Sequence, residues 1–405
     1  MKGAISLQYC LAIDVAESKS MFCVLSQVGE LVLPPTEYGH SISGFQAVLD
    51  VLLALDETDI HIIMESTSIY HLPVERFFRE YTGYEIIILN PIISKENKRN
   101  LRKTKTDRED CLNLANIFFH NDYNQQNSHE QLYHELQAIS RHLNHVQEGQ
   151  NRTKNRFKQL LSLTCPEYIR IFKDNSIYSP TALHFIGCYP HCDMVKQKRV
   201  DALASCLGSV HKRHPNYYRR KAELIKLTLQ DSFPAVTEDS ETVRCLTDIT
   251  KQLAEQEAYI DQLKARLIDL AQATEAFTIY ISVPGIGPLT AALLIAEMKD
   301  IRRFSNVKKL TAACGLDPTI IQSGKSINYH GPISKRGNRL SRKILFNAIM
   351  SILMVTKRTY PDNPIRLYYE KKRGEGKHHH ACVAACSTKL LRILFAMCNQ
   401  NSLFQ

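Results

Sequence analysis

Short apolar runs alternate with stretches of helical spacing over the first third of the chain. Apolar runs of strand length predict five strands, at residues 8–13, 21–26, 31–33, 61–64 and 84–89. Apolar residues at helical spacing predict three helices, at residues 42–55, 73–81 and 106–119, the last with Thr106 as its N-cap. Gly29 separates the second strand from the third, so the first three strands form a meander. This alternation predicts an α/β layer.

Helical periodicity dominates the middle of the chain. Residues 132–163 and 241–271 each carry apolar side chains at helical spacing over a length of many turns. We expect these two helices to pair in antiparallel fashion or to mediate dimerisation, and a simple helical spacer is the alternative. Residues 174–234, between them, have scattered proline, cysteine and basic residues, and we interpret them as irregular.

The last third begins with a glycine-containing turn between two predicted helices. Residues 281–288, Ile-Ser-Val-Pro-Gly-Ile-Gly-Pro, resemble a helix-hairpin-helix element. In such an element Gly285 and Gly287 permit close backbone approach, and the amides of the second helix bind phosphate. A tight helical hairpin without a ligand is the alternative. The complete pattern predicts three domains, at residues 1–125, 126–275 and 276–405, of which the last is mainly α-helical.

The basic residues of the chain are clustered. The formal net charge is +10 over 405 residues, and a hydrophobic content of 44% indicates a globular protein. Clusters of Lys and Arg lie at residues 97–108, 152–158, 212–226 and 335–342. Such clusters are typical of a protein that binds a polyanion, because each phosphate contact releases counterions. Ordinary solubilising charge is the alternative.

Membrane, secretion and zinc signals are weak in this sequence. No stretch has the ~18–20 uninterrupted apolar residues of a membrane span, and residues 1–4 do not begin a signal peptide. Twelve cysteines without a secretory signal indicate reduced thiols, so we expect a cytoplasmic protein with no membrane partner. Neither Cys188, His191 and Cys192 nor the group at residues 378–386 has the paired short spacing of a structural zinc site, so we predict no zinc.

Four carboxylates follow the predicted strands or open the predicted helix. Asp14 follows the first strand and Glu65 the fourth, while Asp107 and Asp110 lie three residues apart on one helical face. Carboxylates gathered in this way can hold two Mg²⁺ ions roughly 3.5–4 Å apart, the separation that clamps a phosphodiester. Taken singly, each would be a turn cap, a solvated strand end or a residue favoured at a helix N-terminus. Together they point to cleavage or transfer of nucleic-acid strands.

Basic residues accompany this site and a second candidate site downstream. Lys103, Lys105 and Arg108 surround the helical carboxylates, where they would neutralise bound phosphates. Ser323 precedes a glycine, so the backbone can turn sharply there and leave the hydroxyl accessible. A hydroxyl is a poor nucleophile without a base, a metal or a positive field, and on spacing alone Ser323 is a turn residue. The basic side chains after it, which could hold a phosphate, are Lys335, Arg336, Arg339 and Arg342.

These motifs resemble the DEDD transposases of bacterial insertion sequences, the group that includes Piv-type DNA invertases and bridge-RNA-guided recombinases. At the N-terminal end the resemblance rests on the Asp14 strand, Met64-Glu65-Ser66 and Lys105-Thr106-Asp107-Arg108-Glu109-Asp110. At the C-terminal end it rests on Val283-Pro284-Gly285-Ile286-Gly287, Ala313-Cys314-Gly315-Leu316, Gln322-Ser323-Gly324 and Ser334-Lys335-Arg336-Gly337-Asn338. One departure is Cys111, because the family usually has an alanine after the last aspartate.

The resemblance implies a fold and a mechanism. The N-terminal domain would have a ribonuclease-H/RuvC-like α/β fold in which the four carboxylates bind Mg²⁺. The middle region carries little family signal, and the helical, coiled-coil region there is predicted from periodicity alone. In the C-terminal domain Ser323 would attack a DNA phosphodiester and form a phosphoserine link. The implied partners are donor and target DNA and a structured bridge RNA, within a nucleoid-associated homodimer or homotetramer. One subunit's carboxylates would meet another subunit's serine.

Two other functions are compatible with the residues. A RuvC-like junction nuclease would use the four carboxylates and water, and would hydrolyse DNA without a serine adduct. A non-catalytic nucleic-acid-binding protein derived from a transposase would need none of these side chains for its effect. The presence of all four acids together with Ser323 argues against the non-catalytic protein, since a retired enzyme would tend to lose at least one of them.

Overall fold

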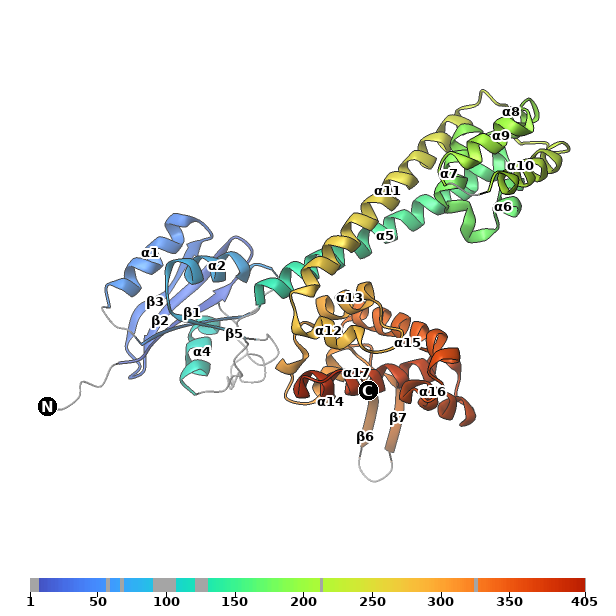
Figure 1. Cartoon of the computed structure of the whole chain (residues 1–405). Helices are drawn as coiled ribbons and strands as arrows, with labels where there is room; N and C mark the ends of the chain where they lie inside the picture. The colour runs from blue at the N-terminus through green and yellow to red at the C-terminus, as the bar shows by residue number, and fades with distance from the viewer. Residues whose placement is uncertain are drawn as a thin grey trace. The chain divides into compact units, whose positions relative to one another are not determined.

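The computed structural model describes residues 7–55, 59–65, 69–89, 107–120, 130–211, 214–323 and 327–404. It divides the chain into two compact units, Met1–Ser128 and His129–Gln405 (Figure 1). The predicted boundary between residues 275 and 276 falls inside the second unit, within a continuous hydrophobic core.

The first unit is built on a five-stranded mixed sheet. Its strands are β1 (Tyr9–Val15), β2 (Lys19–Ser26), β3 (Leu31–Gly39), β4 (Ile60–Glu65) and β5 (Glu85–Leu89), in the order β3-β2-β1-β4-β5. The first three strands are antiparallel, as the predicted meander requires, whereas β4 runs parallel to both β1 and β5. The mixed α/β fold predicted for this region is therefore confirmed.

Helices cover both faces of this sheet (Figure 1). Helices α1 (Ile42–Leu53) and α2 (His71–Tyr81) pack on one face, and α4 (Asp107–Phe119) packs on the other. Side chains alternate along β1, so Leu11 and Ile13 join the core under α1 and α2, while Cys10 and Ala12 join the core under α4. Burial on both faces explains why β1 reads as a continuous apolar run.

The second unit contains two long helices that lie side by side (Figure 1). Helix α5 (Glu130–Thr164) lies beside α11 (Glu241–Gln272). His142 on α5 contacts Tyr259, whereas Thr153, further along α5, contacts Gln256, which lies earlier in the chain. Later residues of α5 therefore lie beside earlier residues of α11, so the two helices run antiparallel. The predicted antiparallel pairing is confirmed.

The segment between these helices is mostly helical, so the prediction that residues 174–234 are irregular is wrong. It forms α6 (Glu167–Phe172), a 3₁₀ turn (Asp174–Tyr178), α7 (Pro180–Cys188), α8 (Cys192–Lys196), α9 (Val200–Gly208) and α10 (Pro215–Leu229). These elements enclose a separate apolar core that also takes in Phe157 of α5 and Leu246 of α11. We call this assembly the helical head. Helices α6 and α8, with six and five residues, are shorter than two turns and therefore show no helical periodicity.

The remaining elements of the second unit pack around a second core. They are α12 (Glu275–Ile281), α13 (Pro288–Met298), a 3₁₀ turn (Ile301–Arg303), α14 (Val307–Ala313), β6 (Pro318–Ser323), β7 (Ile327–Ile333), α15 (Arg339–Thr359), α16 (Pro364–Gly374) and α17 (His379–Gln400). The mainly helical prediction is confirmed, but it did not include the antiparallel β6–β7 hairpin. Helix α17 is long and apolar enough to span a membrane, yet half of that stretch is buried in the core, as in a core helix of a globular protein.

The turn between α12 and α13 is held against another helix. Gly285 has φ +96°, and a Cβ there would lie 2.5 Å from the Cα of Ile352 in α15. Gly287 precedes α13 as its N-cap residue, and a Cβ added to it would meet no atom within 4 Å. The absence of a side chain at Gly285 therefore permits the close approach of this turn to α15.

Candidate functional site

Asp14 and Glu65 lie at the ends of adjacent parallel strands, Asp14 one residue before the end of β1 and Glu65 as the last residue of β4. The register pairs Ile13 of β1 with Met64 of β4, so the next residue of each strand is one of the two carboxylates. Neighbouring strands lie about 4.8 Å apart. Both side chains belong to the α4 face, because Ala12 and Ile63, two residues earlier in each strand, pack in the core under α4. Both are half-buried.

Cys111 fixes the beginning of α4 against the same strand end. Its Sγ lies 3.2 Å from the carbonyl oxygen of Ala12, 3.4 Å from that of Met21 and 3.2 Å from Sγ of Cys23. Met21 is the residue of β2 that pairs with Asp14. The hydrogen bond with Cys23, together with burial, raises the pKa of the Cys111 thiol well above its ordinary range, so the thiol keeps its proton.

This anchor places the helical carboxylates at the strand end. Asp110 directly precedes Cys111 and is half-buried, while Asp107 lies one turn earlier and is exposed. Asp14, Glu65 and Asp110 therefore lie at one end of one sheet face, and Asp107 is exposed one turn earlier on α4. Among the described residues, these carboxylate oxygens do not form a group of three within 4.8 Å of one another. Lys103 and Lys105 lie outside the described residues, whereas Arg108 is exposed on α4.

The donor set fits a hard cation. Four carboxylates offer only oxygen ligands, which Mg²⁺ prefers, and each of them is at least partly exposed to solvent. The thiols beneath them, Cys10, Cys23 and Cys111, belong to the buried core under α4. Burial raises the pKa of the Cys10 thiol well above its ordinary range, so this thiol keeps its proton.

A tight crossing of two loops organises the C-terminal candidate residues. The loop after α14 meets the loop before α15, where the Lys335 amide donates to the Gly315 carbonyl at 3.1 Å and the Asn338 amide donates to the Ala313 carbonyl at 2.8 Å. A Cβ at Gly337 would overlap the backbone atoms of the Gly315 loop, and a Cβ at Gly315 would overlap Gly337. We call this pair of segments, residues 312–317 and 334–338, the loop crossing.

A buried carboxylate holds the loop crossing from below. The side chain of Glu297, on α13, is 0% exposed. It accepts hydrogen bonds from Nδ2 of Asn338 at 2.8 Å and from Oγ of Ser140 at 2.9 Å. Asn338 also caps α15, since its Oδ1 accepts from the Leu340 amide at 2.9 Å. Helix α5, helix α13 and the loop crossing are therefore joined by one polar network.

The four predicted basic contacts do not behave alike. Lys335, Arg336 and Arg339 are exposed around the loop crossing. Arg342 is half-buried, and its Nη1 donates to the carbonyls of Cys314 at 3.0 Å and Gly337 at 2.8 Å. The structure gives Arg342 a role in joining the two loops, which the sequence did not predict.

Ser323 is the last residue of β6, where it pairs with Ile327 of β7. The structure describes its backbone, while its side chain lies outside the described residues. A different hydroxyl, that of Ser334, donates to Oδ1 of Asp317 at 2.6 Å and joins the base of the hairpin to the loop crossing. The predicted nucleophile thus lies at the far end of the hairpin, away from its base.

A basic cavity lies beside the hairpin, and the sequence patterns did not predict it. It has a volume of about 1030 Å³ and is bounded by α14, α16, α17 and the start of β6. Its charged and aromatic lining consists of Lys308, Lys389, Arg392, Asp317 and Tyr368. Nζ of Lys389 lies 4.9 Å from the centre of the Tyr368 ring. The two basic residues of α17 lie in a largely apolar helix, so no charge cluster indicated them.

Comparison with known proteins identifies two family regions. A family model of DEDD transposases matches residues 11–166, and a model described as a transposase of the IS116/IS110/IS902 family matches residues 278–364. The first region contains the four carboxylates, and the second contains the loop crossing and Ser323.

Individual relatives agree with these regions. An uncharacterised protein of insertion element IS116 from Streptomyces clavuligerus is 24% identical over 74% of this chain and 72% of its own. The transposase of insertion element IS1328 from Yersinia enterocolitica is 28% identical over 40% of this chain and 47% of its own. A pilin gene-inverting protein from Moraxella bovis is 31% identical over 30% of this chain and 37% of its own. The last two matches span less than half of the relatives' lengths.

Proposed function

The chain belongs to the DEDD transposases of bacterial insertion sequences, and on that premise we propose that it cuts and rejoins DNA through a covalent serine intermediate. The proposed nucleophile is Ser323. The proposed Mg²⁺ ligands are Asp14, Glu65, Asp107 and Asp110. Names of the relatives cover both transposition and gene inversion, and strand cleavage followed by rejoining is the step that both reactions share.

One observation supports the metal site of this proposal: Asp14, Glu65 and Asp110 lie at the same end of the sheet. Asp14 and Glu65 lie at the ends of adjacent parallel strands on one face, and Cys111 holds Asp110 against that end. A turn cap or a solvated strand end would not require the other acids to gather at the same place. Bound Mg²⁺ would supply a positive charge that stabilises the phosphorane-like transition state and makes a hydroxyl more acidic.

The proposed chemistry conserves the phosphodiester bond energy. Oγ of Ser323 attacks the phosphorus, the bond from phosphorus to one deoxyribose oxygen breaks, and the serine proton leaves to a base or to solvent. The product is a phosphoserine ester and a free deoxyribose hydroxyl. Attack by that hydroxyl, or by one of another strand, reverses the step and reforms DNA without an added energy source.

Exposed cations of the second unit would hold the phosphates. Lys335 has φ 56°, a left-handed conformation that lysine seldom adopts, and its amide is fixed to Gly315. We propose that Lys335, Arg336 and Arg339 contact donor or target DNA or the bridge RNA, with Lys103, Lys105 and Arg108 doing so around the carboxylates. Gly285 and Gly287 remain proposed backbone contacts, and the basic cavity beside β6 is a further phosphate site.

Substitution of single loop cations is expected to flatten the salt dependence of binding. Lys335→Gly removes a charge while suiting the left-handed backbone, and Arg336→Ala removes the neighbouring charge. Each should lower the slope of log K against log salt by about 1 and weaken binding to all DNA sequences. Fluorescence anisotropy with labelled DNA over a salt series measures the slope. Lys251→Ala, exposed on α11, should leave it unchanged, and an unchanged slope for Lys335→Gly would remove that residue from the interface.

The proposed assembly is a homodimer or homotetramer in which one subunit's carboxylates act with another subunit's serine. Long paired helices offer an extended surface for such an assembly, although helices α5 and α11 also serve to carry the helical head. A bridge RNA that pairs with both DNA partners completes the proposed complex.

The decisive experiment is to trap and map the covalent intermediate. Full-length protein is incubated with end-labelled insertion-sequence junction DNA, Mg²⁺ and RNA transcribed from the element's flank, then denatured and digested with nuclease and trypsin. Lys325 separates Ser323 from Ser334, so cleavage there puts the two hydroxyls in different peptides. A nucleotide mass on the Ser323 peptide supports the proposal. DNA cleavage without any adduct supports the hydrolytic RuvC-like nuclease, and an adduct on the Ser334 peptide reassigns the nucleophile.

A further inference from the structure

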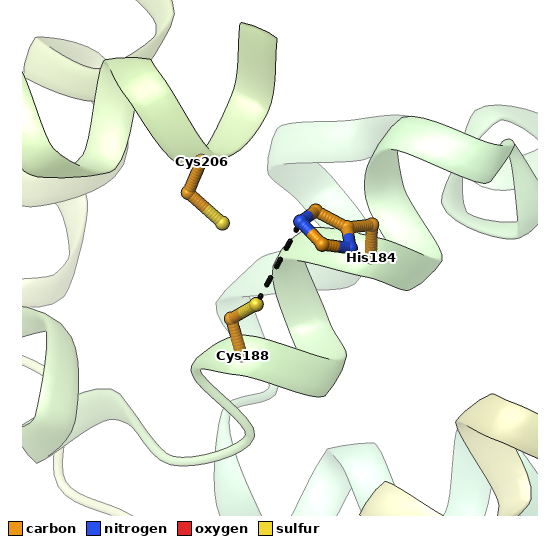
Figure 2. A group of neighbouring side chains, drawn as sticks. All are labelled: His184, Cys188 and Cys206. Atoms are coloured by element: carbon orange, nitrogen blue, oxygen red, sulfur yellow. Dashed lines mark hydrogen bonds between the residues drawn. The ribbon is translucent and has the colours of Figure 1, made fainter. Parts of the chain in front are cut away.

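Three potential metal ligands converge on the surface of the helical head. His184 and Cys188 are one turn apart on α7, and Cys206 lies on α9. Their side chains point toward one another across the space between the two helices (Figure 2). Nε2 of His184 lies 3.8 Å from Sγ of Cys188, and all three ligand atoms lie within 4.8 Å of one another.

These separations suit one tetrahedral ion. With metal–sulfur and metal–nitrogen bonds of about 2.3 and 2.0 Å, the edges of a zinc tetrahedron are about 3.8 Å between sulfurs and about 3.5 Å between sulfur and nitrogen. The observed separation of His184 and Cys188 is already close to such an edge. Small side-chain rotations would bring in Cys206, since α7 and α9 are held together by the apolar core of the helical head.

A second Cys/His group nearby is occupied by other interactions. His191 is buried; its Nε2 donates to the Val236 carbonyl at 2.9 Å and its Nδ1 accepts from the Asp193 amide at 3.3 Å. Asp193 forms an ion pair with Lys196 at 2.9 Å. Metal binding there would break these bonds. His184 and Cys188, in contrast, are exposed, so an ion from solvent can reach them.

We propose that His184, Cys188 and Cys206 form a zinc site, separate from the carboxylate site, with water as the fourth ligand. Two thiolates and an imidazole match the ligand preference of Zn²⁺, whereas Mg²⁺ prefers oxygen. Each thiol releases its proton to solvent when it binds. The bound ion links α7 to α9 and stabilises the helical head. This proposal departs from our prediction of no zinc, which considered Cys188 with His191 and Cys192 and not with Cys206.

Zinc binding by the full-length chain tests the proposal. The protein is reduced with a phosphine, given excess Mg²⁺ to fill the carboxylates, incubated with Zn²⁺ and passed through a desalting column. Elemental analysis should find one zinc per wild-type chain and almost none in Cys188→Ser or Cys206→Ser. Cys245→Ser, which removes an exposed cysteine of α11, should retain one. Co²⁺ in place of Zn²⁺ should give thiolate charge-transfer absorption and strong visible bands in wild type and Cys245→Ser alone.

The thermal midpoint of the wild-type protein should rise with Zn²⁺ and that of Cys188→Ser should not. Circular dichroism establishes that each variant is folded, and His184→Gln, at an exposed position, provides a second test of the same loss. The proposal is overturned by zinc that remains in both cysteine variants, by no uptake in the reduced wild type, or by a Cys188–Cys206 disulfide whose reduction yields no zinc binding.

Discussion

Asp14→Asn and Asp110→Asn are each expected to lower the rate of DNA strand cleavage by more than ~100-fold without lowering the thermal midpoint of the protein. Loss of an outer-shell group around a metal typically costs 10–100-fold, so loss of a direct ligand should cost more. Removing one negative charge from a group of carboxylates does not disturb packing, because asparagine has the same shape. The rate is measured on end-labelled DNA under single-turnover conditions.

Glu109→Gln is the matched control for these variants. Glu109 lies on α4 between Asp107 and Asp110, it is exposed, and it is not among the proposed ligands. Its substitution should leave the cleavage rate within a few-fold of wild type. Mg²⁺ titration by calorimetry should show weaker binding for Asp14→Asn but not for Glu109→Gln. A cleavage rate for Asp14→Asn near that of wild type would remove this residue from the metal site, and a sharp fall in its thermal midpoint would indicate a structural role.

The N-terminal unit could be predicted well because its signals are local. Each strand is an apolar run of the right length, and the carboxylates follow those runs directly. Once β1 and β4 are adjacent and parallel, the position of Asp14 and Glu65 follows from the register. The packing of α4 against β1 could not be predicted from the sequence, because the contact of Cys111 with Ala12 joins residues far apart in the chain.

Features of the second unit depend on distant pairs, and the sequence did not reveal them. The sequence shows two glycines at positions 315 and 337, but it does not show that they are in contact. In the fold a Cβ at either glycine would overlap backbone atoms of the other. Cys188 and Cys206 meet because α7 and α9 share a core, and short-spacing zinc patterns do not include such pairs. The β6–β7 hairpin is a two-stranded sheet within a helical region, where its apolar residues offered only a weak strand signal.

The loop crossing provides the prediction with the largest effect on stability. Gly337→Ala is expected to destabilise the second unit by about 3 kcal/mol or more, because its Cβ would overlap backbone atoms of Ala313 and Gly315 that cannot rotate away. Separating the loops would also break the Asn338 amide's bond to Ala313 and loosen the cap of α15. Urea denaturation followed by circular dichroism measures the loss, and hydrogen exchange at the start of α15 locates it.

Gly149→Ala is a control with the opposite expected sign. Gly149 lies inside α5, and a Cβ there has no atom within 4 Å, so alanine should stabilise the helix by about 0.5–1 kcal/mol. If Gly337→Ala is as stable as wild type, the two loops can separate without cost, and the crossing cannot be what orients Lys335 and Arg336. If it is destabilised and DNA binding also loses its steep salt dependence, the crossing both supports the fold and presents the cations to phosphate.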